Sequence, residues 1–190
     1  MNHSPDAPLS HNTSLAELLG GRAVALVGLM GSGKTTVGRR LATALGYRFC
    51  DADAEIERAA GRSVADIFSE LGEPEFRSGE RRVIARLLAD GPLVLATGGG
   101  AYMDEQTRRL LRERAVTIWL KADIDVLARR VARRDTRPLL RGKNPAEVLS
   151  EQADRRYPVY AEADIVVETP DSAHDAAVAR IVDALRAHLA

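Results

Sequence analysis

The 190-residue chain has few of the features that mark secreted or membrane proteins. It has a single cysteine, Cys50, so no disulfide can form within the chain, and we expect a reducing compartment. No apolar run approaches the ~20 residues that a membrane-spanning helix needs. Residues 1–14 are polar and lack the apolar core of a secretory signal. These absences argue against a membrane partner and favour a cytoplasmic location.

The chain also lacks a net charge, because its 27 basic residues balance its 27 acidic ones. This balance argues against nucleic acid as a partner, since nucleic acids bind proteins largely through an excess of positive charge. The basic residues are nevertheless unevenly spread. Seven of them lie between positions 129 and 143, where the only acidic residue is Asp135. This concentration favours an anionic ligand near that segment.

The most specific pattern present is Gly28–Thr35, which matches the phosphate-binding loop G-x-x-x-x-G-K-[ST] at every fixed position. It follows an apolar run at 23–27 and precedes a helical pattern at 34–45, as the motif requires. Glycines let backbone N–H groups face one concavity, and the helix N-terminus adds positive potential there. Lys34 is expected to reach the β- and γ-phosphates of a nucleotide, and Thr35 to ligate Mg²⁺. A plain glycine turn would need neither residue.

Short apolar runs alternate with helical patterns from residue 21 to residue 190, which we take as one domain. The alternation predicts an α/β fold with a parallel sheet covered by helices on both faces. The five predicted strands are Ala23–Val27, Tyr47–Cys50, Leu93–Thr97, Val116–Leu120 and Asp164–Glu168. The predicted helices are Lys34–Leu45, Ala54–Ala60, Val64–Leu71, Glu75–Ala89, Asp104–Glu113, Ile124–Arg133, Pro145–Glu162 and Ser172–Leu189. Residues 1–20 are predicted to be a disordered leader.

Ligands of such folds bind beyond the carboxyl ends of the strands. Asp53, after the second strand, suits either a ligand group or the N-cap of the next helix, whereas Asp51 is harder to explain as a cap. The run Gly98–Gly100 follows the third strand and suggests that a ligand approaches bare backbone, with a flexible hinge as the alternative. The segment Thr136–Pro145 is typical of a mobile lid over phosphates, with a plain basic loop as the alternative.

In combination, these motifs resemble those of the shikimate kinases, which are phosphate-loop kinases related to the nucleoside monophosphate kinases. The resemblance spans about residues 22–189 and rests on Gly28–Thr35, Asp51–Asp53, Glu75–Arg77, Leu95–Gly100, Thr136–Leu140 and Arg156–Tyr160. It implies a five-stranded parallel sheet, a lid at about 135–146 and a monomeric enzyme. The implied reaction transfers the γ-phosphate of ATP to the 3-hydroxyl of shikimate, in the synthesis of aromatic amino acids.

The resemblance also implies the role of each site residue. Asp53 would bind the hydroxyls of shikimate and help to remove the proton. Arg77 and Arg156 would hold the carboxylate, and Gly98, Gly99 and Gly100 would contact the ring. Lys34 and Arg137 would act on the transferring phosphate, Arg137 from the lid, and Thr35 would ligate Mg²⁺ with Asp51 behind its water. The implied ATP-binding set is Gly31, Ser32, Gly33, Lys34, Thr35, Thr36, Arg130 and Arg137, with Arg130 stacked on adenine.

Two other functions fit parts of this pattern: a related small-molecule kinase, such as gluconate kinase, and a nucleotide-binding module without catalytic activity. The paired arginines Arg77 and Arg156 and the glycine run favour a cyclic acid over gluconate. The presence of Lys34, Thr35, Asp53 and Arg137 argues against a module that has lost catalysis. Cys50 and Trp119 lie in predicted strands, where an inert thiol and a core side chain are expected.

Overall fold

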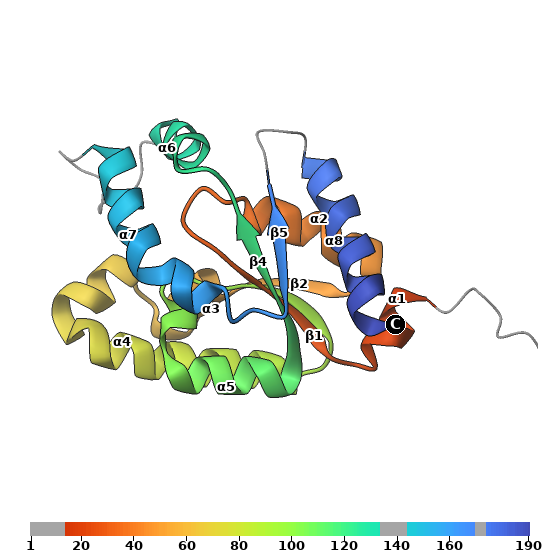
Figure 1. Cartoon of the computed structure of the whole chain (residues 1–190). Coiled ribbons are helices and arrows are strands. Elements are labelled where there is room, and N and C mark those ends of the chain that lie inside the picture. The colour runs from red at the N-terminus through yellow and green to blue at the C-terminus, as the bar shows by residue number, and fades with distance from the viewer. Residues whose placement is uncertain (1–13, 134–143, 170–173) are drawn as a thin grey trace, which may run out of the picture.

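The structure is a computed structural model that describes residues 14–133, 144–169 and 174–190. Its centre is a sheet of five parallel strands in the order β2-β3-β1-β4-β5 (Figure 1). The predicted five-stranded parallel sheet is therefore confirmed, and each strand boundary lies within one residue of its predicted position. The strands are β1 (Ala23–Val27), β2 (Arg48–Asp51), β3 (Leu93–Ala96), β4 (Ala115–Lys121) and β5 (Ile165–Glu168).

The helices follow the predicted order, with two differences. The predicted helices Val64–Leu71 and Glu75–Ala89 form one element, which bends where Gly72 leaves helical geometry with φ 79°, two residues before Pro74. A short helix, α1, precedes the first strand and was not predicted. The helices are α1 (Leu15–Leu19), α2 (Lys34–Leu45), α3 (Ala52–Ala60), α4 (Val64–Ala89), α5 (Glu105–Arg114), α6 (Ile124–Ala132), α7 (Pro145–Tyr160) and α8 (His174–Leu189), with a 3-10 turn, η1 (Ala101–Met103).

Strands β1 and β3 are apolar throughout because both of their faces are buried. Successive side chains of a strand point to opposite faces of the sheet. Ala25 and Val27 of β1 therefore join the core under α4, α5 and α7, whereas Val24 and Leu26 join the core under α1, α2 and α8. In Figure 1, α2 and α8 lie across the sheet from α4 and α5. Two packed layers of helix thus hold the ends of the strands in place.

Helix α1 corrects part of the predicted leader. Ser14 forms a capping box with Glu17, in which each side chain accepts a hydrogen bond from the other residue's backbone N–H. Leu15 and Leu19 are buried in the core that includes α8. Residues 14–20 therefore belong to the folded domain, and the prediction of disorder through residue 20 is wrong for them. The rest of the predicted leader lies outside the described residues.

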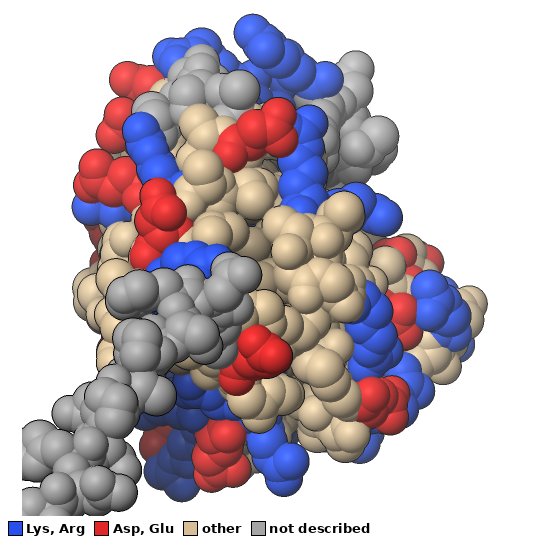
Figure 2. All heavy atoms as spheres, turned by 90° about the vertical axis from the view of Figure 1, so that its right-hand side faces the viewer, with Lys and Arg blue, Asp and Glu red and all other residues tan. Residues whose placement is uncertain are grey.

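The exterior is polar and mixed in charge. On the face that carries α1 and the end of α8, basic and acidic side chains are interspersed, as a chain without net charge would predict (Figure 2). Within the part of the chain that the structure describes, no helix has the length and apolar character needed to cross a membrane.

Candidate active site

The predicted site segments meet at one edge of the sheet because each follows one of three neighbouring strands. The phosphate loop follows β1, Asp51 ends β2, and the glycine run follows β3. Thr97, directly after β3, joins the ends of β3 and β1, because its backbone N–H and its hydroxyl both donate to the carbonyl oxygen of Leu26, at 3.1 and 2.9 Å. This is the carboxyl edge, where ligands of parallel sheets bind.

The phosphate loop has the close contacts that require its glycines. Gly28 has φ 153°, and a Cβ there would lie 2.8 Å from the carbonyl oxygen of Leu120. Gly33 is the N-cap of α2, so the N-terminus of that helix opens into the loop. The ammonium group of Lys34 donates to the carbonyl oxygens of Gly28 and Leu29 at 2.8 and 3.0 Å, and so lies across the loop.

Ser32 gives the loop a further polar group that faces inward. Its side chain is 2% exposed, and its hydroxyl oxygen has no hydrogen-bond partner among the described residues. A buried hydroxyl without a partner is costly, so a ligand that supplies one is favoured there. Phosphate oxygens are such partners, and the loop therefore fits a phosphorylated ligand.

Thr35 and Asp51 bring two oxygen groups together beside the loop. The Thr35 hydroxyl donates to Asp51 Oδ2 at 2.9 Å. The other carboxylate oxygen of Asp51 accepts from the backbone N–H of Ala54 at 3.5 Å, so Asp51 is the N-cap of α3. The alternative that Asp53 caps this helix is therefore wrong, and so is the expectation that Asp51 is the harder of the two to explain as a cap, because β2 runs into α3 without a loop. The cap thus lies at the last residue of the strand.

These oxygens fit Mg²⁺ better than a metal that needs a complete protein cage. Mg²⁺ prefers oxygen ligands and is usually held by one or two protein groups together with substrate phosphates and water. Among residues 14–133, 144–169 and 174–190, no group of three or more His, Cys, Asp or Glu side chains could hold a metal ion. The hydroxyl and the carboxylate lie next to the phosphate loop, as a shared magnesium site requires.

Asp53 lies on the first turn of α3, open to solvent on one side. The surrounding protein atoms still replace part of its water, and this burial raises the pKa of its carboxyl group above the usual 3.8. The like charge of Asp51 acts in the same direction. The positive charges of Lys34 and Arg77 oppose both effects. Asp53 is therefore a stronger base than an ordinary aspartate and lies within electrostatic reach of the phosphate loop.

Arg77 is fixed in α4 by an acid that the sequence analysis did not identify. Its guanidinium donates to Glu80 Oε2 at 2.6 Å, and its Cζ lies 5.1 Å from the centre of the Phe76 ring. Glu80 is 1% exposed, and its second oxygen has no partner among the described residues. Burial raises the pKa of Glu80, which Arg77 opposes. The sequence did contain a signal for this ion pair. Arg77 and Glu80 are spaced i, i+3 on one helix, and the apolar residues Val83 and Ile84 that follow indicate that this face is buried.

The glycine run contacts the three predicted substrate residues. A Cβ on Gly98 would lie 2.8 Å from Asp53 Oδ1, and one on Gly99 would lie 3.1 Å from Arg156 Nη1. A Cβ on Gly100 would overlap the guanidinium of Arg77. None of the three glycines has a positive φ, so close approach, and not backbone conformation, requires glycine there. The neighbours that approach are the protein's own side chains.

The glycine run also meets the phosphate loop, since a Cβ on Gly99 would lie 3.7 Å from the carbonyl oxygen of Gly28. Arg130, on α6, lies at another side of the loop and donates to the carbonyl oxygen of Gly31 at 3.4 Å. Arg137 and residues 135–143 of the predicted lid lie outside the described residues. Residues 144–146, which the prediction also gave to the lid, form the N-cap and first turn of α7.

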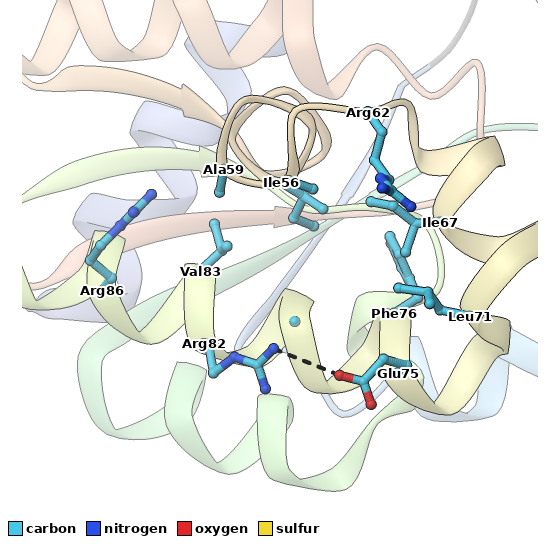
Figure 3. A pocket seen from close by; sticks show the side chains of 12 residues that line it. Ile56, Ala59, Arg62, Ile67, Leu71, Glu75, Phe76, Arg82, Val83 and Arg86 are labelled. Carbon is cyan, nitrogen blue, oxygen red and sulfur yellow. Dashed lines mark ion pairs between the residues drawn. The ribbon is translucent and has the colours of Figure 1, made fainter.

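A separate cavity of about 620 Å³ lies between α3 and α4 (Figure 3). No predicted site residue lines it. Its arginines are paired with acids: Arg82 with Glu75 at 3.9 Å, Arg86 with Glu55 at 3.8 Å, and Arg62 with Glu70. These ion pairs neutralise the arginines that line the cavity. The candidate active site is therefore the carboxyl edge of the sheet and not this cavity. The lining residues are Ile56, Ala59, Ala60, Arg62, Ile67, Leu71, Glu75, Phe76, Gly79, Arg82, Val83 and Arg86.

Comparison with known proteins agrees with this arrangement. A family profile described as shikimate kinase matches residues 30–186. A shikimate kinase from Caulobacter vibrioides is 62% identical over 165 residues, which are 87% of this chain and 82% of the relative. The chain belongs to the shikimate kinase family.

Other shikimate kinases extend the likeness over most of the chain. The one from Brucella canis is 51% identical over 176 residues, which are 93% of this chain and 88% of the relative. A solved shikimate kinase from Acinetobacter baumannii, in complex with shikimate, has a TM-score of 0.84 at 37% identity. The match covers 90% of this chain and 97% of the Acinetobacter chain. The sheet, the phosphate loop and the glycine run are thus parts of a shikimate kinase fold.

Proposed function

We propose that the protein transfers the γ-phosphoryl group of ATP to the 3-hydroxyl of shikimate, giving shikimate 3-phosphate and ADP. One observation carries the proposal. The glycine run lies against the side chains of Asp53, Arg77 and Arg156, which are the candidate shikimate-binding groups. It also lies against Gly28 of the phosphate loop. An acid held against Arg77 and Arg156 is therefore next to a phosphate held in the loop. The names of the relatives, and the shikimate bound to the Acinetobacter enzyme, support the same acceptor.

The nucleotide half of the site would be formed by Gly31, Ser32, Gly33, Lys34, Thr35 and Thr36. Backbone N–H groups and the N-terminus of α2 would hold the β- and γ-phosphates. Lys34 would exchange the carbonyl oxygens of Gly28 and Leu29 for phosphate oxygens, and Ser32 would gain a partner for its buried hydroxyl. Arg130 extends from α6 over the loop and would place its planar guanidinium on adenine.

Thr35 would ligate Mg²⁺ directly, and Asp51 would accept a hydrogen bond from a water of the ion. Their 2.9 Å separation leaves the two groups able to share one ion with the phosphates. When bound, Mg²⁺ neutralises charge on the β- and γ-phosphate oxygens.

The acceptor half would be formed by helices α3, α4 and α7 against the glycine run. Arg77 and Arg156 would bind the carboxylate of shikimate, because a guanidinium can donate two parallel hydrogen bonds to a carboxylate. Glu80 holds the guanidinium of Arg77 in a fixed orientation for that contact. Asp53 would accept hydrogen bonds from the ring hydroxyls, since an ionised carboxylate is an acceptor only.

The transfer itself needs positioning more than covalent catalysis. The 3-hydroxyl oxygen of shikimate bonds to the γ-phosphorus, and the bond from that phosphorus to the β–γ bridging oxygen breaks with its electron pair. ADP leaves, and Asp53 accepts the hydroxyl proton and later releases it to water. Lys34 stabilises charge on the transferring group, and Arg137 would reach the same group from the predicted lid.

The test is ADP release with Mg·ATP, measured by a coupled assay in the presence of shikimate, of gluconate, or of no acceptor. We expect turnover that depends on shikimate, with the phosphate placed on the 3-oxygen by phosphorus NMR of the product. Turnover with gluconate instead would assign the protein to gluconate phosphorylation. No turnover with either acid would favour the nucleotide-binding module.

We also propose that the enzyme works as a monomer in the cytoplasm. The resemblance to the shikimate kinases supports a monomer, and the reaction requires a compartment that supplies ATP. Light scattering after size-exclusion chromatography should give the mass of one chain. A larger mass that persists on dilution would contradict the monomer.

A further inference from the structure

Tyr160 is a buried polar side chain behind the acceptor residues. It ends α7, one helical turn after Arg156, and its side chain is 0% exposed. Its ring packs at 5.8 Å from the ring of Trp119 and at 6.4 Å from those of Tyr102 and Tyr157, measured between centroids. The ring therefore has a fixed place, and only its hydroxyl reaches out of the aromatic cluster toward the site.

The hydroxyl of Tyr160 donates a hydrogen bond to the carbonyl oxygen of Gly99. Gly99 is the centre of the glycine run, and its neighbours contact Asp53 on one side and Arg77 on the other. A glycine run has no side chains with which to restrain itself. The carbonyl oxygens of Gly98 and Gly100 accept from the backbone N–H groups of Ala101 and Met103, and the buried phenol supplies the hydrogen bond to the carbonyl between them.

The same hydroxyl lies beside Arg156. Nη1 of Arg156 is 3.1 Å from the position that a Cβ on Gly99 would take, so the arginine, the glycine and the phenol lie together. Burial raises the pKa of Tyr160 above its usual 10.0, while the charge of Arg156 and a hydrogen bond from it oppose that shift. At neutral pH the phenol is protonated, and it can donate to Gly99 while accepting from Arg156.

We propose that Tyr160 is a positioning residue for the acceptor pocket: its hydroxyl holds the carbonyl of Gly99 and the guanidinium of Arg156 in one fixed relation. Because Tyr160 is fully buried, it acts on the substrate only through these two partners. The Gly99 backbone, which would face the ring of shikimate, and Arg156, which would bind its carboxylate, are thereby held at a fixed distance from each other. This inference rests on the proposed phosphorylation of shikimate.

The variant Tyr160→Phe tests the inference, because it removes the hydroxyl and keeps the ring. Tyr157→Phe is the matched control. Tyr157 lies on the same helix, its ring is 4.9 Å from that of Trp119, and its hydroxyl donates to the carbonyl oxygen of Ala122 at 3.4 Å. We expect the KM for shikimate to rise about tenfold in Tyr160→Phe, as the loss of one buried hydrogen bond implies. The KM for ATP, and both constants of Tyr157→Phe, should stay unchanged.

The measurements separate positioning from a purely structural role and from failure of the proposed function. An unchanged KM for shikimate in Tyr160→Phe, or equal changes for shikimate and ATP together with a lower Tm, overturns the inference. If the wild-type protein releases no ADP with shikimate, the proposed function fails instead. Combining Tyr160→Phe with Arg156→Lys should cost less than the sum of the two single changes, because both act on the same contact.

A second test leaves Tyr160 in place. Arg156→Lys keeps the positive charge but loses the planar fork that can hold the phenol and the carboxylate together. We expect backbone amides of residues 98–101 to exchange with deuterium faster in this variant, since the phenol loses one of its two partners. Exchange at the wild-type rate would mean that Arg156 and the glycine run are not coupled through Tyr160, and it would overturn the inference.

Discussion

The variant Gly98→Ala should damage the acceptor pocket without touching the nucleotide. The added Cβ would lie 2.8 Å from Asp53 Oδ1 and 3.1 Å from Glu80 Oε1, and contacts under 3.0 Å essentially never occur for a real Cβ. Because Gly98 does not have a positive φ, its backbone can accept the side chain, and the carboxylates have to move instead. A 1 Å misplacement of a catalytic group can cost about 10²-fold, so a shift of a few tenths of an ångström should lower kcat/KM for shikimate by roughly fourfold to tenfold.

Gly79→Ala is the control for this experiment. Gly79 lies in α4, next to Glu80, and the nearest atom to an added Cβ is Arg82 Nη2 at 3.9 Å. This change should leave the kinetics unchanged and stabilise the helix by up to ~1 kcal/mol. The assay is coupled ADP release with varied shikimate at saturating ATP, with nucleotide affinity measured by calorimetry. Wild-type kcat/KM for shikimate in Gly98→Ala would refute the contact between the glycine run and Asp53.

Four further predictions concern the site. Lys34→Ala should lower kcat by at least about a hundredfold in a folded protein, through lost stabilisation of phosphate charge, and a near-normal kcat by the coupled assay would contradict this. Arg77→Ala should raise the KM for shikimate by roughly tenfold to a hundredfold and leave the KM for ATP unchanged, whereas equal losses would remove Arg77 from the acid pocket. Because the ionised form of Asp53 is the active one and its pKa is raised, kcat/KM should fall with decreasing pH along a limb centred above 3.8. The same shift makes the proton of Asp53 more tightly held in the folded state, so the Tm of wild type relative to Asp53→Asn should decrease as pH rises through that limb.

Most of the strands could be predicted from sequence because they contain a short apolar run between polar segments, whereas β2 (Arg48–Asp51) has only two apolar residues, Phe49 and Cys50. The strands at 23–27 and 93–96 are buried on both faces, so each is apolar at every position and can be recognised from the sequence. Helix α1 was missed because five residues are too few for a helical period. It is held by packing of Leu15 and Leu19, although the S-x-x-E spacing of Ser14 and Glu17 was a readable start signal. The formation of helix α1 therefore depends on tertiary packing, which a local sequence pattern does not show.

The site residues also include some that the sequence predicts and some that it does not. The phosphate loop could be predicted because its groups are contiguous in the chain and the motif states their roles. Arg77 and Arg156 stand on different helices, and a lone arginine on a helix is usually a surface residue, so only the family resemblance suggested them. Glu80 was missed because an acid three residues after an arginine is also common on exposed helix faces, so the spacing alone does not show that the acid is buried. The structure joins it to Arg77 at 2.6 Å.

The glycine run explains why residues so distant in sequence form one pocket. Each of its positions is next to a different helix: Gly98 beside Asp53 of α3, Gly99 beside α7, and Gly100 beside Arg77 of α4. Any side chain in the run would displace the side chain of Asp53, Arg156 or Arg77, and the groups from three helices could then not converge on one small acid. Because the same backbone touches the phosphate loop at Gly28, a displaced acceptor would also be displaced from the phosphate. The run therefore sets both how the acid is held and how far its hydroxyl lies from the transferring group, and this is why changes there should alter catalysis before they alter stability.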